Sequence, residues 1–166
     1  MPSLLSYLQE RFSGVFRLAI LGAGSMLKAD DAAGCLVVEN LKAAIGSHPN
    51  VLLCIGETAP ENYSGKICAF KPSHLLLLDA ADVGAAPGEI VEINPEDVGG
   101  PTFCSHMLPL KIMVNYIVNE TRADAVLLGM QYETIKFDGR MSQKMEKAVQ
   151  TLSDALLELI ETQISR

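Results

Sequence analysis

The sequence of 166 residues lacks the features that mark several large classes of protein. It has no tryptophan, and 20 aspartates and glutamates outnumber 13 lysines and arginines, which gives a formal net charge of −7. An acidic chain without a basic cluster is a poor binder of nucleic acid, so we expect no nucleic-acid partner. No apolar run approaches the roughly 18 residues of a membrane-spanning helix, and no signal peptide begins the chain. We therefore expect a cytoplasmic protein without membrane insertion.

Cysteine is sparse as well, and its spacing argues against the usual metal and disulfide frameworks. The four cysteines are spread along the chain without a C-x-x-C pair; they are Cys35, Cys54, Cys68 and Cys104. Scattered single cysteines are typical of buried thiols in a reducing compartment. We expect reduced cysteines, with neither a cysteine-ligated zinc site nor a disulfide framework.

Three common catalytic or nucleotide-binding motifs are missing. The chain has no G-x-S-x-G elbow and no G-x-x-x-x-G-K-S/T phosphate loop, which argues against an α/β-hydrolase triad and a P-loop. The turn at residues 22–24, Gly-Ala-Gly, lacks the third glycine of a dinucleotide-binding motif, because Leu27 occupies that position. A helix N-terminus can still bind a phosphate, so a nucleotide-binding α/β domain stays an alternative.

The chain is organised around residues 17–34, which read as strand, loop and helix. Residues 18–21 form an unbroken apolar run of the kind that is buried on both faces of a parallel sheet. After the glycine turn comes the acidic pair Asp30 and Asp31, at the start of a predicted helix. Carboxylates there complement the positive end of the helix dipole, and Asp30 is the predicted N-cap. Sites in α/β sheets are built at this same edge, so structural and catalytic roles are both open.

Apolar runs alternate with segments of helical spacing along the rest of the chain, which predicts an α/β fold. Strands are predicted at residues 18–21, 51–55, 74–78, 89–93 and 125–130. Helices are predicted at residues 3–13, 31–45, 60–70, 108–119 and 142–163. We expect a single α/β domain over residues 1–166, with a twisted, mostly parallel five-stranded sheet and helices on both faces. Residues 1–14 precede the first strand and are expected to add an extra N-terminal helix.

Three separated positions carry groups that bind metals: Asp31, Asp79 and His106. Asp79 directly follows the apolar run of residues 74–78, and His106 lies in a loop before a predicted helix. Because the carboxyl ends of adjacent parallel strands meet at one edge, this set would suit a divalent metal with open positions for substrate. The ligand types do not choose between nickel and zinc. Ordinary roles stay open too: a helix-dipole partner, a turn cap and a plain loop histidine.

Five motifs, in order along residues 17–163, resemble the hydrogenase maturation endopeptidases, in the branch that processes nickel–iron (NiFe) hydrogenases of the formate-hydrogenlyase type. The motifs are LGAGSMLKADDAAG, GETAPEN, LLLLDAADVGAAPGEI, SHMLPL and LLGMQ. The first motif departs from the family pattern twice, since Ser25 replaces the usual asparagine and Ala32 the usual glycine. Ser25 keeps a hydrogen-bonding group, and Ala32 suggests that the helix begins directly after Asp31.

The resemblance implies an aspartyl-type protease with one specific substrate. Members of the family remove a short C-terminal extension from the precursor of the hydrogenase large subunit, after nickel has been inserted. By resemblance, Asp31, Asp79 and His106 are the catalytic and metal-binding residues. They recognise nickel that the precursor supplies, rather than nickel held by the free enzyme. The partner is then the large-subunit precursor, and we expect the enzyme itself to be a monomer.

The sequence leaves open how the attacking water is activated. Nickel can polarise the scissile carbonyl or lower the pKa of a bound water, or a carboxylate can act as general base, with Asp30 as the neighbouring candidate. No serine or cysteine stands beside a base, which disfavours a covalent intermediate. A non-catalytic chaperone of the same fold that binds the nickel site of its partner is a further alternative.

Overall fold

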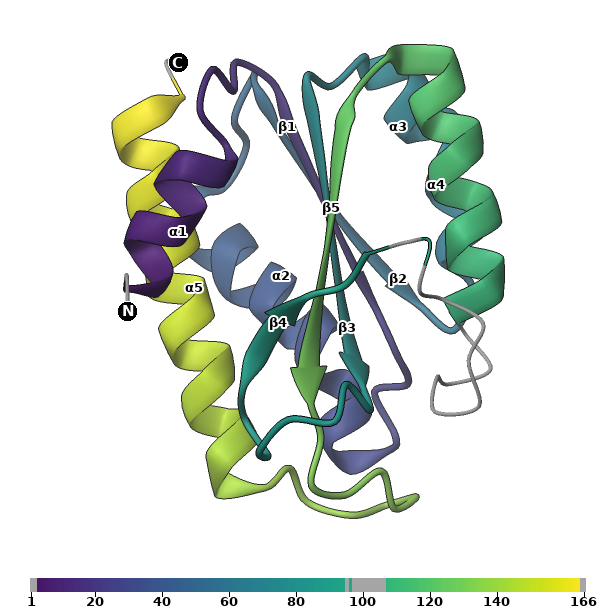
Figure 1. Ribbon diagram of the computed structural model, residues 1–166, viewed down its shortest axis with the longest axis vertical. Coiled ribbons are helices and arrows are strands. Elements are labelled where there is room, and N and C mark those ends of the chain that lie inside the picture. The colour runs from purple at the N-terminus through teal and green to yellow at the C-terminus, as the bar shows by residue number, and fades with distance from the viewer. Residues whose placement is uncertain (1–2, 95, 97–106, 165–166) are drawn as a thin grey trace.

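The computed structural model describes residues 3–94, 96 and 107–164 and shows helices packed on both sides of one twisted sheet (Figure 1). In this part of the chain the sheet has five strands: β1 (Leu18–Ala23), β2 (Val51–Glu57), β3 (His74–Ala81), β4 (Ile90–Glu92) and β5 (Asp124–Gln131). Their order is β2-β1-β3-β5-β4, and the short edge strand β4 runs antiparallel to β5 while the other pairs are parallel. The predicted fold class is confirmed.

The helices form a layer on each face of the sheet (Figure 1). One layer holds α1 (Leu4–Arg11), α2 (Ala33–Ile45) and α5 (Gln143–Gln163), and the other holds α3 (Ser64–Phe70) and α4 (Met107–Thr121). Two short 3-10 helices, η1 (Ala29–Ala32) and η2 (Pro60–Tyr63), follow β1 and β2. Each layer closes its own hydrophobic core against the sheet.

Strands β1 and β3 lie at the centre of the sheet, and every residue in both is buried. This explains their continuous apolar runs, since a strand that is covered on both faces has no side suited to polar groups. Asp79 is the one carboxylate in these two strands. Its position near the end of β3 is therefore an energetic exception within the core of the fold.

The start of the second helix differs from the prediction. The acidic pair lies in η1, and α2 begins only at Ala33, so the helix does not start directly after Asp31. The predicted N-cap role of Asp30 is also wrong, because Ala32 is the N-cap of α2 and Lys28 that of η1, neither with a side-chain cap. Ala29 adopts a left-handed backbone conformation with φ of 43°, which tightens the chain into a 3-10 turn. The helix predicted over residues 60–70 is likewise divided into η2 and α3.

The helix predicted at residues 3–13 is present as α1 and belongs to the main core. Ser3 caps it by accepting a hydrogen bond from a backbone N–H of the first turn at 3.1 Å. Leu8 and Phe12 are fully buried in the core that α1 shares with α5. Arg11 ties the helix to the sheet through two hydrogen bonds to Asp124, of 2.8 Å and 3.1 Å.

Cys35, Cys54 and Cys68 are free thiols, the first two of them buried, and Cys104 lies outside the described residues. Within the described ranges, no helix combines the length and the apolar character needed to cross a bilayer.

Helix α2 meets the sheet at a point where only backbone fits. Gly34, in the first turn of α2, lies against the carbonyl oxygen of Leu78, and a Cβ atom at Gly34 would overlap that oxygen. Gly22 of β1 lies equally close to the backbone of Gly34. This contact holds the start of α2 against the carboxyl ends of β1 and β3, where Asp31 and Asp79 lie.

We predict that Gly34→Ala lowers the free energy of unfolding by about 1–3 kcal/mol, because the obstructing atoms belong to backbone that cannot rotate away. Gly65→Ala in α3 is the matched control, since a Cβ atom there meets nothing within 4 Å and alanine favours a helix. Urea unfolding of both variants checks the prediction. Equal stabilities for the two would show that the contact at Gly34 is not restrictive.

Candidate active site

Two of the three predicted site residues lie at the carboxyl edge of the sheet. Asp31 belongs to η1, which follows β1, and Asp79 lies near the end of β3, in register with Gly129 of β5. Both are buried, with 6% of Asp31 and 2% of Asp79 exposed. They are close enough for the negative charge of Asp31 to act on the carboxyl group of Asp79. The fold thus gathers two acidic side chains where a parallel sheet usually builds its site.

The loop after β1 wraps around Asp31 and fixes its carboxylate. The backbone N–H of Ser25 donates a 2.8 Å hydrogen bond to Asp31 Oδ2. Gly24 has φ of 119°, and a Cβ atom there would overlap the carbonyl oxygen of Asp31, so this turn needs glycine. Because Ser25 uses its backbone to bind Asp31, the replacement of the family's asparagine by serine leaves this bond intact.

Asp79 is buried without full hydrogen bonding. Its Oδ2 atom has no hydrogen-bond partner among the described residues. Burial and, to a smaller extent, the negative charge of Asp31 together raise the pKa of Asp79 to about 8, although a hydrogen bond from the Ala80 backbone acts in the opposite direction. At neutral pH the free protein therefore holds Asp79 mainly as the neutral acid. A buried carboxyl oxygen left without a partner is costly and points to a binding role.

Asp30 has a structural role that the sequence did not predict. Its carboxylate, which is fully buried, accepts bonds from Glu133 N at 2.8 Å and Thr134 N at 3.2 Å. Ser142 donates two more, from its backbone at 2.7 Å and its hydroxyl at 2.9 Å. Asp30 thereby anchors the loop between β5 and α5, and its occupied, inaccessible carboxylate does not suit a general base.

The third predicted ligand, His106, lies outside the described residues. Among the residues that the structure does describe, no group of three metal-binding side chains comes together. Asp31 and Asp79 therefore supply two carboxylates without a third described ligand. The other two histidines lie away from the acidic pair. His48 accepts a hydrogen bond from the Asn50 N–H in the turn before β2, and His74 is at the opposite end of β3.

A small hollow of about 110 Å³ lies beside the loop that holds Asp31. Gly24 lines it together with Glu57, Pro60 and Pro109, so its walls come from the ends of β1 and β2, from η2 and from α4. The Gly24 N–H donates to the Glu57 carbonyl at 2.9 Å, which joins the two loops. The GETAPEN segment, noted in the sequence without a role, thus forms one wall beside the acidic pair.

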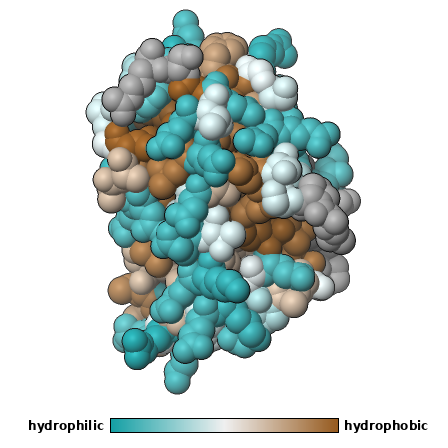
Figure 2. All heavy atoms as spheres, turned by 90° about the vertical axis from the view of Figure 1, so that its left-hand side faces the viewer, coloured by the Kyte–Doolittle hydropathy of each residue, from teal (hydrophilic) through white to brown (hydrophobic). Residues whose placement is uncertain are grey.

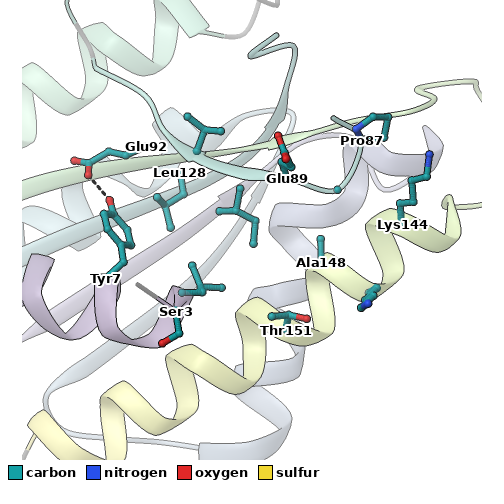
Figure 3. A pocket seen from close by; sticks show the side chains of 14 residues that line it. Ser3, Tyr7, Pro87, Glu89, Glu92, Leu128, Lys144, Ala148 and Thr151 are labelled. Carbon is teal, nitrogen blue, oxygen red and sulfur yellow. Dashed lines mark hydrogen bonds between the residues drawn. The ribbon is translucent and has the colours of Figure 1, made fainter. Parts of the chain in front are cut away.

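A larger groove of about 700 Å³ lies between α1, β4 and α5 (Figure 3). Ile90, Leu128 and Ala148 line its apolar part, and the hydrogen bond from Tyr7 to Glu92 crosses one end. Figure 2 looks at the side of the molecule with α1 and α5 and shows hydrophobic atoms exposed between hydrophilic ones. Neither Asp31 nor Asp79 lines this groove, and no sequence motif had indicated it.

Fold and site together define an α/β protein with a buried acidic pair at the carboxyl edge of its sheet, and comparison with known proteins gives its family. Residues 35–159 match the family model described as hydrogenase maturation protease. The chain is 30% identical over 160 residues to a putative hydrogenase maturation protease of Methanocaldococcus jannaschii, an alignment that covers 93% of this chain and 94% of the relative. It is 33% identical over 141 residues to the hydrogenase 3 maturation protease of Escherichia coli, with 82% and 86% covered.

Solved structures agree with this assignment. The crystal structure of the nickel–iron hydrogenase maturation protease HycI from Thermococcus kodakarensis matches with a TM-score of 0.87 and 34% identity, over 94% of this chain and 99% of that one. The solution structure of the endopeptidase HycI from Escherichia coli matches with a TM-score of 0.72 and 30% identity, over 84% and 88%. The chain belongs to the hydrogenase maturation protease family and is an endopeptidase of that family, as its motifs had indicated.

We predict that Asp30→Asn lowers the free energy of unfolding by about 2–4 kcal/mol, because the amide nitrogen turns toward donors that a carboxylate had satisfied. Asp154→Asn is the control: this exposed residue of α5 accepts one bond from Gln150, and its change is expected to stay within about 0.5 kcal/mol. Urea titration measures both. A loss no larger than that of the control would contradict the anchoring role of Asp30.

The raised pKa of Asp79 predicts that the stability of the protein depends on pH. The pKa of Asp79 is about 8 in the folded protein, whereas its ordinary value is 3.8. Between pH 3.8 and about pH 8, the folded protein therefore keeps a proton on Asp79 that the unfolded chain loses. Stability from Asp79 is therefore present at low pH and is lost as pH rises toward 8. Asp79→Asn cannot ionise, so its stability relative to wild type should grow over this window, by at most about 6 kcal/mol, and level off above it. Urea midpoints from pH 5 to pH 9 test this, and a constant difference would contradict it.

Proposed function

We propose that this protease removes the C-terminal extension of a nickel–iron hydrogenase large-subunit precursor after nickel insertion. Asp31, Asp79 and His106 recognise the nickel that the precursor carries. Family membership supports the class of substrate. The observation that supports the nickel-recognising role is the buried Asp79 oxygen, which has no hydrogen-bond partner in the described part of the chain and lies within reach of the Asp31 charge.

Nickel fits this site better as part of the substrate than as a resident metal. Asp79 must lose its proton before it can coordinate a metal, and its raised pKa makes that loss unfavourable at neutral pH. Asp31, Asp79 and His106 supply at most three ligands, so further coordination positions are left for ligands that the precursor supplies. Engagement of that nickel brings the scissile bond to the edge of the sheet and holds it there.

Cleavage itself is hydrolysis: water adds to the scissile carbonyl carbon, the C–N bond breaks, and the leaving nitrogen takes a proton. Two routes to water activation fit the site. The nickel can polarise the carbonyl or acidify a bound water, or a carboxylate can take the proton of the water, either Asp31 or Asp79 once it has lost its own proton. Asp30 is not suited to the second route, because four hydrogen bonds already occupy its carboxylate.

The buried thiol next to the site does not suit nucleophilic catalysis. Cys35 Sγ lies 3.5 Å from the Gly22 carbonyl and 3.6 Å from the Gly24 carbonyl, to which it can donate. Burial raises the pKa of Cys35 to about 11, so almost no thiolate forms at neutral pH. Hydrolysis by direct attack of water therefore fits the site better than a thioester intermediate.

The nucleotide-binding alternative is disfavoured by how the glycine turn uses its backbone. Gly24 N–H donates to the Glu57 carbonyl, and Ser25 N–H donates to Asp31. These are the donors that a phosphate would need, and a carboxylate already stands where its charge would go. The chaperone alternative predicts binding of the precursor without cleavage.

We predict that Asp31→Asn slows processing of a nickel-loaded large-subunit precursor by about a hundredfold or more, because the substrate's nickel loses a charged ligand that positions the bond. The assay follows the precursor by mass spectrometry and looks for release of a C-terminal peptide. Asp154→Asn, on the exposed face of α5, should cleave like wild type, and nickel-free precursor should stay intact with every variant.

The processing assay distinguishes the protease from the chaperone alternative. Wild type that binds the precursor and never cleaves it would support the chaperone. Cleavage that is equally fast with nickel-free precursor, or with Asp31→Asn, would refute recognition of nickel by this pair.

A further inference from the structure

Large hydrophobic side chains are exposed at seven positions in the described residues, and three of them fall in two loops beside the acidic pair. Leu27 lies in the loop between β1 and η1, while Ile135 and Phe137 lie in the loop between β5 and α5. Leu27 and Phe137 are each 60% exposed. Single exposed hydrophobic residues need no explanation, but several in neighbouring loops mark a surface that contacts a partner.

The two loops, residues 25–29 and 134–140, lie side by side; we call them the paired loops. Asp138 N–H donates to the Leu27 carbonyl at 2.9 Å, and Asp30 N–H donates to the Thr134 carbonyl at 3.0 Å. The buried carboxylate of Asp30 accepts one more bond from the second loop, from the Thr134 N–H at 3.2 Å, and another from Glu133 directly before that loop. The exposed hydrophobic residues therefore stand on loops that are anchored to the core.

Both loops also hold a residue in a conformation that side chains disfavour. Ala29 has φ of 43° and Asp138 has φ of 53°, although neither is glycine. A Cβ atom at Gly139 would lie 3.4 Å from the Ala29 Cβ, so the two strained turns meet. Such backbone strain persists where surrounding contacts impose it, and it gathers at functional sites.

The charge of the paired loops contrasts with that of the whole chain. Lys28, Lys136 and Arg140 are exposed, and none of them forms an ion pair with a described residue. Asp138 is the one exposed acid in these loops, in a chain whose net charge is −7. Cations between hydrophobic side chains complement a segment that is acidic and apolar.

The paired loops lie at the same end of the sheet as the acidic pair (Figure 1). Lys28 and Ala29 directly precede Asp30 and Asp31 in the chain. A second copy of this protein seated on the loops would crowd the edge at which Asp31 and Asp79 must receive a substrate. The substrate itself is therefore the occupant that this position favours.

We propose that the paired loops dock an acidic, apolar segment of the hydrogenase large-subunit precursor, next to the nickel that Asp31 and Asp79 engage. This inference rests on the proposed function and adds to it a second recognition surface. Leu27 and Phe137 supply the apolar contact, and Lys28 and Lys136 speed and orient association. Docking here raises affinity without taking part in the chemical step.

The first test replaces two apolar contacts by Leu27→Ser together with Phe137→Ser. With nickel-loaded precursor, the double variant should bind about five- to tenfold more weakly and raise KM by a similar factor, while kcat stays within about twofold. Phe16→Ser is the matched control, because Phe16 is 64% exposed and lies before β1, at the other end of the sheet. Unchanged binding of the double variant, or an equal effect of the control, would overturn the proposal.

The second test reverses charge by Lys28→Glu together with Lys136→Glu. Precursor binding should weaken, and its dependence on salt concentration should diminish, because two attractive charges become repulsive. Lys147→Glu, in the groove of Figure 3, is the control and should leave binding unchanged. A larger effect from Lys147→Glu than from the loop variant would place docking in that groove and overturn the proposal.

Direct binding and cleavage together separate this proposal from the proposed function. Wild type that binds but does not cleave refutes the protease reading for that precursor, while the loop variants still decide the docking surface. Wild type that neither binds nor cleaves the precursor overturns both proposals.

Sedimentation of the free protein tests whether the paired loops instead form a contact between copies of this chain. Self-association that Phe137→Ser abolishes would assign the loops to such a contact and overturn docking of the precursor.

Discussion

The site depends on one unfavourable interaction, the burial of the Asp79 carboxyl group beside Asp31. Asp79 is 2% exposed, and one of its oxygens has no partner among the described residues. Desolvation is the main effect that opposes ionisation of Asp79, and the negative charge of Asp31 adds to it. The apolar strands on both sides and the close contact at Gly34 hold the acid in place. The free protein thus keeps Asp79 as a neutral acid, which agrees with the proposal that a cation reaches it only with the substrate.

The two proposals place two kinds of recognition at one edge of the sheet. In these proposals the acidic pair responds to the charge of a metal, and the paired loops offer apolar and cationic side chains at the same end of the sheet (Figure 1). Asp30 connects them, since it precedes Asp31 in η1 and anchors the loop that carries Phe137. A protease that tests both the metal and a protein segment would spare most other peptides, because neither contact suffices to place a scissile bond.

Local patterns in the sequence predicted most of the fold and the position of Asp31 and Asp79 at the carboxyl edge of the sheet. The apolar runs ending at Leu21 and Leu78 are central strands, and the long stripe after Ser142 is a buried helix face. The anchoring role of Asp30 could not be predicted from local sequence patterns, because its hydrogen-bond partners lie more than 100 residues away in the chain. The groove of Figure 3 arises where α1 passes the edge strand, which periodicity does not reveal. The contribution of His106 stays a prediction.

The central claim is that a neutral Asp79 becomes a carboxylate when it meets the nickel of the substrate. Calorimetry at pH 7 in two buffers of different ionisation enthalpy counts the protons released when nickel-loaded precursor binds. With a pKa of about 8, Asp79 should release close to one proton, and Asp79→Asn or nickel-free precursor should release almost none. Tight binding of nickel-loaded precursor with no proton release, or with the same release from Asp79→Asn, would contradict the account.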